Sequence, residues 1–278
     1  MISERNVKIR AFATEKRMGA AVAKDVGKIL RTYTTKKGLP VVGNFAAAPS
    51  QDAFLDRLCK AKGCDWSKLL AVHLDEYFDL PKGHCNTFQA YLDEHLFGKV
   101  PVPRENIRYI KDVEGASVED VAEKYERIMR DTIADVRGKG GVYIACIGIG
   151  VNGHIAFNEP HVDKRTSRMV IPVEIDDVSV RQQYDDYKNH PNPSARYASL
   201  ADVPRRAVTV SCAGILDAEM IFCTVPGAHK AAAVKAMCDG PISDAVPASL
   251  LRMHPNVTIY LDEASASQLD EIPRIVHR

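Results

Sequence analysis

Apolar residues along the chain follow two repeats in turn, and the alternation predicts a succession of helices and strands. Residues 15–33 carry apolar side chains at helical spacing, which is typical of a helix with one buried face. Unbroken apolar runs at 39–44 and 69–74 are typical of strands that are covered on both faces. The same patterns predict helices at 51–60 with Ser50 as N-cap, near 86–97, at 117–136 and from about 228, and strands at 142–147, 207–212, 220–225 and 257–261.

The order of these elements predicts an α/β fold. Alternation of strands and helices along the chain is typical of a Rossmann-like, doubly wound, mostly parallel sheet with helices on both faces. No repeat, linker or low-complexity tract divides residues 1–278, so we expect a single domain. Residues 184–202 are polar and follow neither repeat, which is typical of a solvated excursion or of a lid over a site.

The segment CIGIGVNGHIAFNEP, residues 146–160, holds the first candidate site. It directly follows the predicted strand at 142–147, and its glycines allow sharp turns or a close approach to a ligand, as at Gly153. The loop can therefore present Asn152, His154 and Glu159 to one small volume. The alternative is a glycine-rich turn whose histidine is satisfied by its neighbours.

A second strand ends in acidic residues. The apolar run at 69–74 is followed at once by Asp75 and Glu76. Open parallel sheets bind ligands at the carboxyl ends of their strands, so this end and the histidine loop are expected to form two walls of one pocket. Taken alone, the two carboxylates favour a solvated acidic turn, and together with the histidine loop they favour the pocket.

Composition narrows the class of protein. The chain has 37 basic and 36 acidic residues and a net charge of +1, so no global field favours nucleic acid or an anionic membrane. The seven cysteines show no CxxC pair or zinc spacing, which indicates reduced thiols and no metal site. No run of about 18 apolar residues and no signal-peptide core occurs, so we expect a soluble, cytoplasmic protein. Whether copies form a homo-oligomer is left open.

The motifs LDEYFDLP at 74–81 and GIGVNGHIAFNEP at 148–160 resemble those of glucosamine-6-phosphate deaminases, also called isomerases. This family shares its fold with 6-phosphogluconolactonases, from which the FNEP at 157–160 separates it. LPKGHCNTF, VPRRAVTVSCAGILDAEMI and PGAHKAAAVKA follow in the family's order. The resemblance implies an enzyme that converts an amino sugar phosphate to a ketose phosphate and ammonia, by proton transfers alone and with no cofactor.

The resemblance also implies roles for single residues. His154, oriented by Glu159, would open the sugar ring, because a carboxylate fixes the imidazole tautomer. Asp75 would carry the proton between C2 and C1, and burial would raise its pKa toward the working pH. Glu76 would hold the loop. Lys230 would contact the phosphate, with an ordinary exposed lysine as the alternative.

One departure from the family falls on the histidine loop. Asn152 stands where the family has an aspartate directly before the GH pair. An amide neither takes a proton nor offsets the charge of an imidazolium. Loss of one positioned acid or base costs about 10²–10⁴ in rate, so this residue puts the standard reaction in question.

Other departures gather at the expected phosphate end. The loop FAAAPS places Ala46, Ala47 and Ser50 where the family has glycines and a threonine. Gln183 stands near the place of the family's phosphate-binding arginine, and Arg181 lies two positions away. His84 matches a family histidine whose role is expected to be structural.

These departures leave alternatives to the deaminase. One is a catalytically weak homologue that binds a sugar phosphate as a sensor. Another is an enzyme for a sugar with a different acid group or none. Hydrolysis of a sugar lactone ranks last, because FNEP and LDEY favour the deaminase branch.

Overall fold

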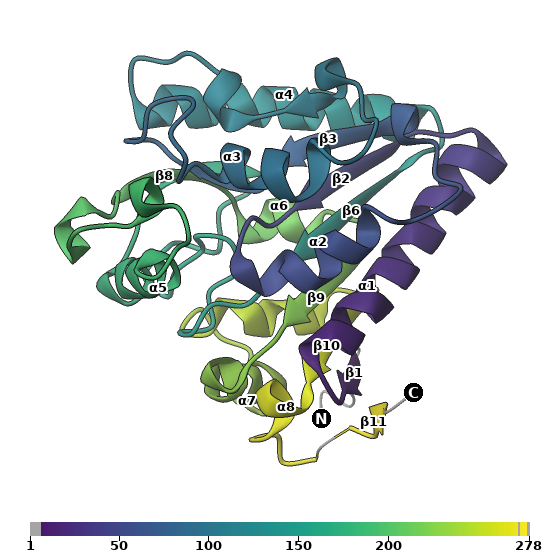
Figure 1. Cartoon of the computed structure of the whole chain (residues 1–278). Helices are drawn as coiled ribbons and strands as arrows, with labels where there is room; N and C mark the ends of the chain where they lie inside the picture. The colour runs from purple at the N-terminus through teal and green to yellow at the C-terminus, as the bar shows by residue number, and fades with distance from the viewer. Residues whose placement is uncertain (1–6, 272, 277–278) are drawn as a thin grey trace.

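The computed structural model describes residues 7–271 and 273–276, and its centre is an eight-stranded sheet (Figure 1). The strand order is β11-β1-β10-β9-β6-β2-β3-β5, and every pair of neighbours runs parallel. The predicted α/β class with a mostly parallel sheet is confirmed. The strands are β1 (Lys8–Phe12), β2 (Val41–Phe45), β3 (Leu69–His73), β5 (Ile107–Arg108), β6 (Val142–Ile147), β9 (Met220–Val225), β10 (Val257–Asp262) and β11 (Ile275–Val276).

Helices cover both faces of this sheet (Figure 1). On one face lie α1 (Glu15–Leu30), continued by a π-helical segment (Arg31–Lys37), α2 (Asp52–Leu58), and α3 (Phe88–Leu92), continued by Asp93–Phe97. On the other lie α4 (Val118–Gly138), α6 (Cys212–Leu216), α7 (Ala231–Asp239) and α8 (Glu263–Ala266). No helix in the described part of the chain is both long enough and apolar enough to span a membrane.

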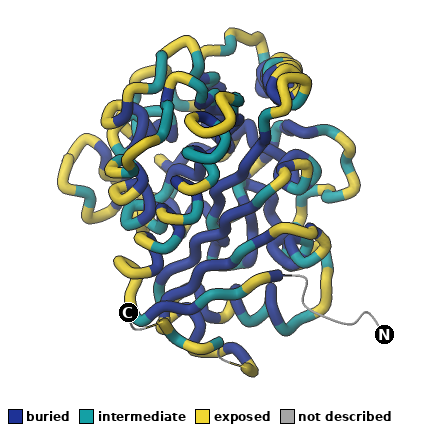
Figure 2. The backbone as a smooth tube through the Cα atoms, turned by 90° about the vertical axis from the view of Figure 1, so that its right-hand side faces the viewer, coloured by how far each residue is buried: buried dark blue, intermediate teal, exposed yellow. Residues whose placement is uncertain are grey.

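Strand β6 shows why the unbroken apolar runs predict central strands. All six of its residues are buried, and their side chains alternate between the two hydrophobic clusters. Tyr143 and Ala145 join the cluster under α4, whereas Ile144 and Cys146 join the cluster under α1 and α2. A strand with two buried faces needs apolar residues at every position. Figure 2 shows the central strands as a buried layer inside exposed loops.

A second, smaller sheet was not predicted. It is antiparallel, in the order β4 (Asp75–Tyr77), β8 (Arg206–Val210), β7 (Val170–Glu174). The apolar run at 207–212 was expected to continue the βα succession, and that expectation is wrong, because a short apolar run does not encode its pairing partner. The sheet matters for function because it fixes Asp75 opposite Thr209.

The expected N-cap of the helix at 51–60 is corrected by the structure. Ser50 is not an N-cap: a 3-10 turn (Pro49–Gln51) precedes α2, and the Ser50 hydroxyl accepts a hydrogen bond of 3.1 Å from the Gln51 side chain. Pro49 explains the turn, because a proline fixes φ and starts a helical segment readily.

The polar segment 184–202 is more ordered than its sequence predicts. Helix α5 (Asp177–Tyr187) runs into it, and Tyr187 and Tyr197 are buried with their rings 5.8 Å apart. Asn86 donates a 3.0 Å hydrogen bond from its side chain to the carbonyl of Ala195. The segment is therefore ordered by the contact between its two tyrosine rings and joined to the loop before α3 by the hydrogen bond from Asn86.

Candidate active site

Four neighbouring strands, β9, β6, β2 and β3, end at one pocket of about 60 Å³. The segment after each strand supplies a wall: 46–48 after β2, Asp75 after β3, 148–150 after β6 and Lys230 after β9. This is the strand edge at which the sequence places a site. Of the predicted site residues, the pocket brings together Ala46, Ala47, Ser50, Asp75, His154 and Lys230.

Asp75 and Glu76 are both buried but have different surroundings. Asp75 lines the pocket, and burial, aided by the neighbouring charge of Glu76, raises its pKa to about 8. The Glu76 carboxylate accepts hydrogen bonds from the backbone N–H groups of Tyr77, Phe88 and Gln89 at 2.9–3.1 Å. Burial raises its pKa to about 7 against the effect of these donors. Glu76 therefore stabilises the start of α3 through its hydrogen bonds, and Asp75 is the carboxylate that lines the pocket.

The backbone of the glycine loop makes room for His154. A Cβ atom on Gly150 would lie 2.1 Å from two atoms of the imidazole ring, so any larger residue there displaces the ring. Gly153 has φ +84°, a conformation that other residues rarely adopt. Gly153 itself packs toward Val246 and does not line the pocket. The two glycines thus shape the loop and present the histidine.

His154 is held in its neutral form. Burial lowers the pKa of the imidazole to about 3, and the nearby charge of Lys230 acts in the same direction. Its Nδ1 shares a 3.0 Å hydrogen bond with the Ser179 hydroxyl. Glu159 Oε2 lies 3.8 Å from the same nitrogen, beyond hydrogen-bond length, and the Glu159 side chain lies behind the pocket wall. The sequence analysis did not identify Ser179 as a partner of His154, because a single serine in a helix belongs to no motif.

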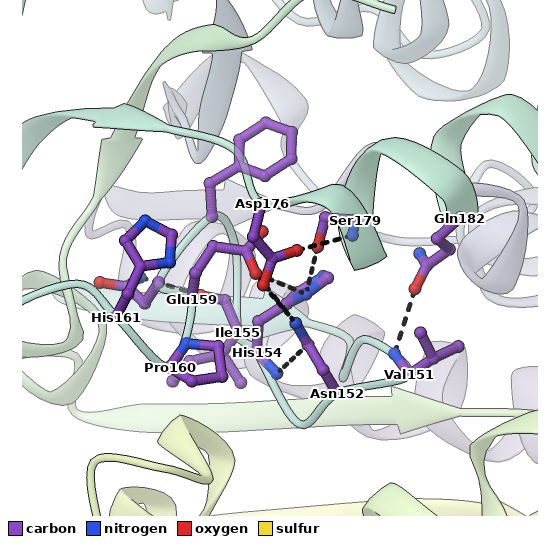
Figure 3. Close-up of polar contacts among 12 residues, drawn as sticks. Val151, Asn152, His154, Ile155, Glu159, Pro160, His161, Asp176, Ser179 and Gln182 are labelled. Carbon is purple, nitrogen blue, oxygen red and sulfur yellow. Dashed lines mark hydrogen bonds and ion pairs between the residues drawn. The ribbon is translucent and has the colours of Figure 1, made fainter. Parts of the chain in front are cut away.

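Asn152 bridges two carboxylates (Figure 3). Its Nδ2 donates to Glu159 Oε2 at 2.9 Å and to Asp176 Oδ2 at 3.1 Å, and its Oδ1 accepts from the His154 backbone N–H at 3.1 Å. Asp176 also caps α5, since its Oδ1 accepts from the backbone N–H of Ser179 at 2.8 Å. An aspartate at 152 has no hydrogen to donate to either carboxylate.

Glu159 and Asp176 have opposite pKa shifts. Burial raises the pKa of Glu159 to about 7, and the hydrogen bond to Asp176 adds to the effect. Burial also acts to raise the pKa of Asp176, but hydrogen bonds from Glu159 and from the Ser179 backbone lower it overall. Near neutral pH, Asp176 therefore carries the negative charge behind His154, and Glu159 is the carboxyl that readily holds a proton.

Lys230 lines the pocket from the segment after β9. It is only 4% exposed, which rules out an ordinary surface lysine. Its Nζ donates a 3.0 Å hydrogen bond to Gln182 Oε1, which also accepts from the Val151 backbone N–H at 3.1 Å. Burial lowers the pKa of Lys230 to about 8, while the charge of Asp186 acts against that shift.

Besides Glu76 and Gly153, the structure places two more predicted binding residues away from the pocket lining. Arg181 is exposed, and its helix instead turns Gln182 and Gln183 into the pocket. His84 is half-buried in the loop before α3, where its Nδ1 accepts from the Asn86 backbone N–H at 3.1 Å. Within the described residues, no group of three or more histidine, cysteine or acidic side chains is arranged to hold a metal ion.

The mostly parallel sheet, with buried titratable groups in a pocket at the ends of its strands, defines the class as an α/β protein of Rossmann-like fold. Residues 16–181 match the family described as glucosamine-6-phosphate isomerases/6-phosphogluconolactonase, and the chain belongs to that family. The resemblance drawn from the two motifs is therefore confirmed.

Curated relatives and solved structures agree with this assignment. A glucosamine-6-phosphate deaminase of Lactobacillus helveticus (strain DPC 4571) is 30% identical over 236 residues, 85% of this chain and 88% of the relative. A glucosamine-6-phosphate deaminase of Rhodopirellula baltica (strain DSM 10527 / NCIMB 13988 / SH1) is 32% identical over 206 residues, 74% of each chain. The fold is similar to that of a monomeric glucosamine-6-phosphate deaminase, with a TM-score of 0.79, 22% identity and coverage of 94% of this chain and 99% of the other.

The lactonase branch of the family shares the fold to a lesser degree. A 6-phosphogluconolactonase of Trypanosoma brucei has a TM-score of 0.69 and 18% identity, with coverage of 94% of this chain and 98% of the other. Family members are thus deaminases and lactonases, both of which are enzymes.

Proposed function

We propose that this chain is a deaminating aldose–ketose isomerase that acts on an amino sugar, either glucosamine 6-phosphate or a close relative. The observation that carries the proposal is the pairing of Asp75 and neutral His154 in the lining of one pocket. A carboxylate whose pKa is about 8 is suited to remove and return a carbon-bound proton near neutral pH. The names of the curated relatives support the same reaction class.

The proposed reaction begins with ring opening at His154. In the tautomer whose Nδ1–H donates to the Ser179 hydroxyl, Nε2 takes the proton of the anomeric hydroxyl and passes it to the ring oxygen as the bond from that oxygen to C1 breaks. Asp75 then removes the proton from C2 of the open chain and returns it to C1. The resulting C2 imine takes up water and releases ammonia, which leaves a ketose. Asn152, Glu159 and Asp176 hold the histidine loop during these steps.

Release of ammonia and of a ketose by the purified chain tests the proposal. Both products should form from glucosamine 6-phosphate or a related amino sugar in equal amounts, and Asp75→Asn should remove the activity while the circular dichroism spectrum stays unchanged. Activity that persists in Asp75→Asn would contradict the role of Asp75. No ammonia from any amino hexose or its phosphate would reject the reaction.

A further inference from the structure

The pocket continues past Lys230 into a second cavity of about 200 Å³. The two cavities share four lining residues, which are Ala48, Ser50, Gln182 and Lys230. Asp75 and His154 line only the first cavity, so the second lies at the end of the pocket remote from the reacting carbons. We call this shared region, together with Gln51, the far end.

The charges at the far end do not suit a phosphate dianion. Lys230 is the one lysine or arginine among the described residues that line the two cavities, and Asp186 and Glu15 line the second cavity beside it. His229, also in that wall, has its pKa lowered by burial, so it adds little positive charge near neutral pH. One buried ammonium and two exposed carboxylates line this cavity, so a dianion placed there would find a single cation and two like charges.

Gln51 supplies an independent observation. It is 1% exposed and lines the first cavity. Its Nε2 is engaged by Ser50 Oγ at 3.1 Å and the Thr224 carbonyl at 3.4 Å, whereas its Oε1 has no hydrogen-bond partner among the described residues. A buried acceptor of this kind requires a donor. A phosphate dianion offers acceptors only, but a hydroxyl group offers a donor and an acceptor together.

From the charge balance and the unpartnered Gln51 acceptor, we infer that the far end binds an uncharged hydroxymethyl group and that the substrate is an unphosphorylated amino sugar. The inference rests on the proposed function for the reaction and narrows its substrate class. The terminal hydroxyl donates to Gln51 Oε1 and accepts from Lys230, whose ammonium already donates to Gln182 and lies in the field of the Asp186 carboxylate.

The first experiment compares kcat/KM for ammonia release from glucosamine and galactosamine with that from their 6-phosphates, with Asp75→Asn as the blank. The free sugars should be favoured by at least about tenfold, since a site with unpaired polar groups discriminates strongly. Equal or higher kcat/KM for a 6-phosphate overturns the inference. Millimolar inorganic phosphate should leave turnover of the free sugar unchanged, and competitive inhibition by phosphate would also overturn it.

A binding experiment separates this inference from the proposed function. The non-reacting open-chain alcohol glucosaminitol and its 6-phosphate are titrated into the wild-type chain by calorimetry. If no amino sugar releases ammonia but glucosaminitol binds more tightly than its phosphate, the proposed reaction fails and the substrate class stands. Tighter binding of the phosphate, or no binding of either compound, rejects the substrate class whatever the activity.

Two substitutions test the residues that carry the argument. Asp186→Asn removes one carboxylate, so the preference for free sugar over 6-phosphate should fall several-fold. Asp185→Asn is the matched control, because Asp185 lies next in the same helix, pairs with Lys188 at 2.7 Å and lines neither cavity. Gln51→Leu should raise KM for the free sugar. If the Gln51→Leu variant does not fold, the comparison of Asp186→Asn with Asp185→Asn tests the inference. An unchanged preference in Asp186→Asn counts against the inference.

Discussion

The two ends of the pocket are built in different ways. At the histidine end, the polar atoms of Asn152 and Ser179 have partners within the chain, and together they hold His154 in one orientation. At the far end, a buried acceptor of Gln51 has none among the described residues, and Lys230 shares its surroundings with carboxylates. From this difference we expect reaction and recognition to be separate properties of the site, with the proposed proton transfer at one end and selection of the ligand at the other.

The family match covers the histidine end and part of the far end. The matched residues, 16–181, include Asp75 and the whole histidine loop. Gln182 and Lys230 lie beyond them. The proposed chemistry thus lies within the matched residues, whereas the far end combines matched residues, Ala48, Ser50 and Gln51, with Gln182 and Lys230 beyond them.

The largest expected effect is that of Asp75→Asn, which tests whether the histidine end does the chemistry. We expect kcat/KM to fall by about 10²–10⁴, because the substitution removes the proposed base and keeps the side-chain volume. In the wild type, kcat/KM should rise with pH up to about 8, where Asp75 loses its proton. A pH-rate profile checks this, and a profile that is flat between pH 6 and 8 would contradict the assignment.

The same variant has an opposite effect on stability. The pKa of Asp75 is raised from 3.8 to about 8, so the folded chain keeps a proton that the unfolded chain releases within that range. The stability cost of Asp75 therefore grows as pH rises from 4 to 8. Asp75→Asn should raise Tm more at pH 8 than at pH 5 in thermal melts. A gain that is larger at pH 5 would show that Asp75 is not buried as described.

Gly150→Ala tests the position of the imidazole rather than its chemistry. The new methyl group would lie 2.1 Å from the His154 ring, so the ring must leave its place, and we expect kcat/KM to fall by about 10²-fold. Gly138→Ala is the control, because a Cβ atom there meets nothing within 4 Å. Equal activity of the two variants would show that the pocket tolerates a displaced histidine.

The sequence predicts the histidine end better than it predicts the far end. Asp75 and His154 follow apolar strands within contiguous motifs, so periodicity and the rule of strand ends place them in one pocket. Gln51 and Gln182 carry no such signal, because a glutamine in a helical segment is ordinary on a solvated face. In the sequence, Asp176 has only the residue type of a helix N-cap. The fold shows that Asn152 donates hydrogen bonds to both Asp176 and Glu159.

The main errors of the sequence interpretation have a common physical cause. β8 was assigned to the main succession, and Ser50 was assigned as a cap, from residue types alone. Pairing of strands depends on long-range contacts, and the choice between a cap and a 3-10 turn depends on one proline and on tertiary packing. Such contacts are not encoded in a local pattern, whereas burial on both faces of a strand is.

Asn152→Asp tests whether the departure from the family weakens the histidine end. A third carboxylate beside Glu159 and Asp176 loses both donated hydrogen bonds and adds like charge, so we expect kcat/KM to fall by about 10–10²-fold. The double variant Asn152→Asp/Asp176→Asn exchanges amide and carboxylate and should recover most of the loss. Steady-state kinetics of both variants decide the point, and an increase of orders of magnitude in Asn152→Asp would mean that the native asparagine has cost the chain its acid–base function.

Ser179→Ala gives the smallest expected effect and the finest test of the comparison. The variant removes the hydroxyl that shares a 3.0 Å hydrogen bond with His154 Nδ1 but leaves the Asp176 cap and the Asn152 bridge in place. A neutral hydrogen bond contributes about 1 kcal/mol, so kcat should fall by about fivefold, while KM and the preference between free and phosphorylated sugar should not change. If the preference shifts together with kcat, the two ends of the pocket are coupled through α5, which carries Ser179 and Gln182 alike, and reaction and recognition are not separate in this site.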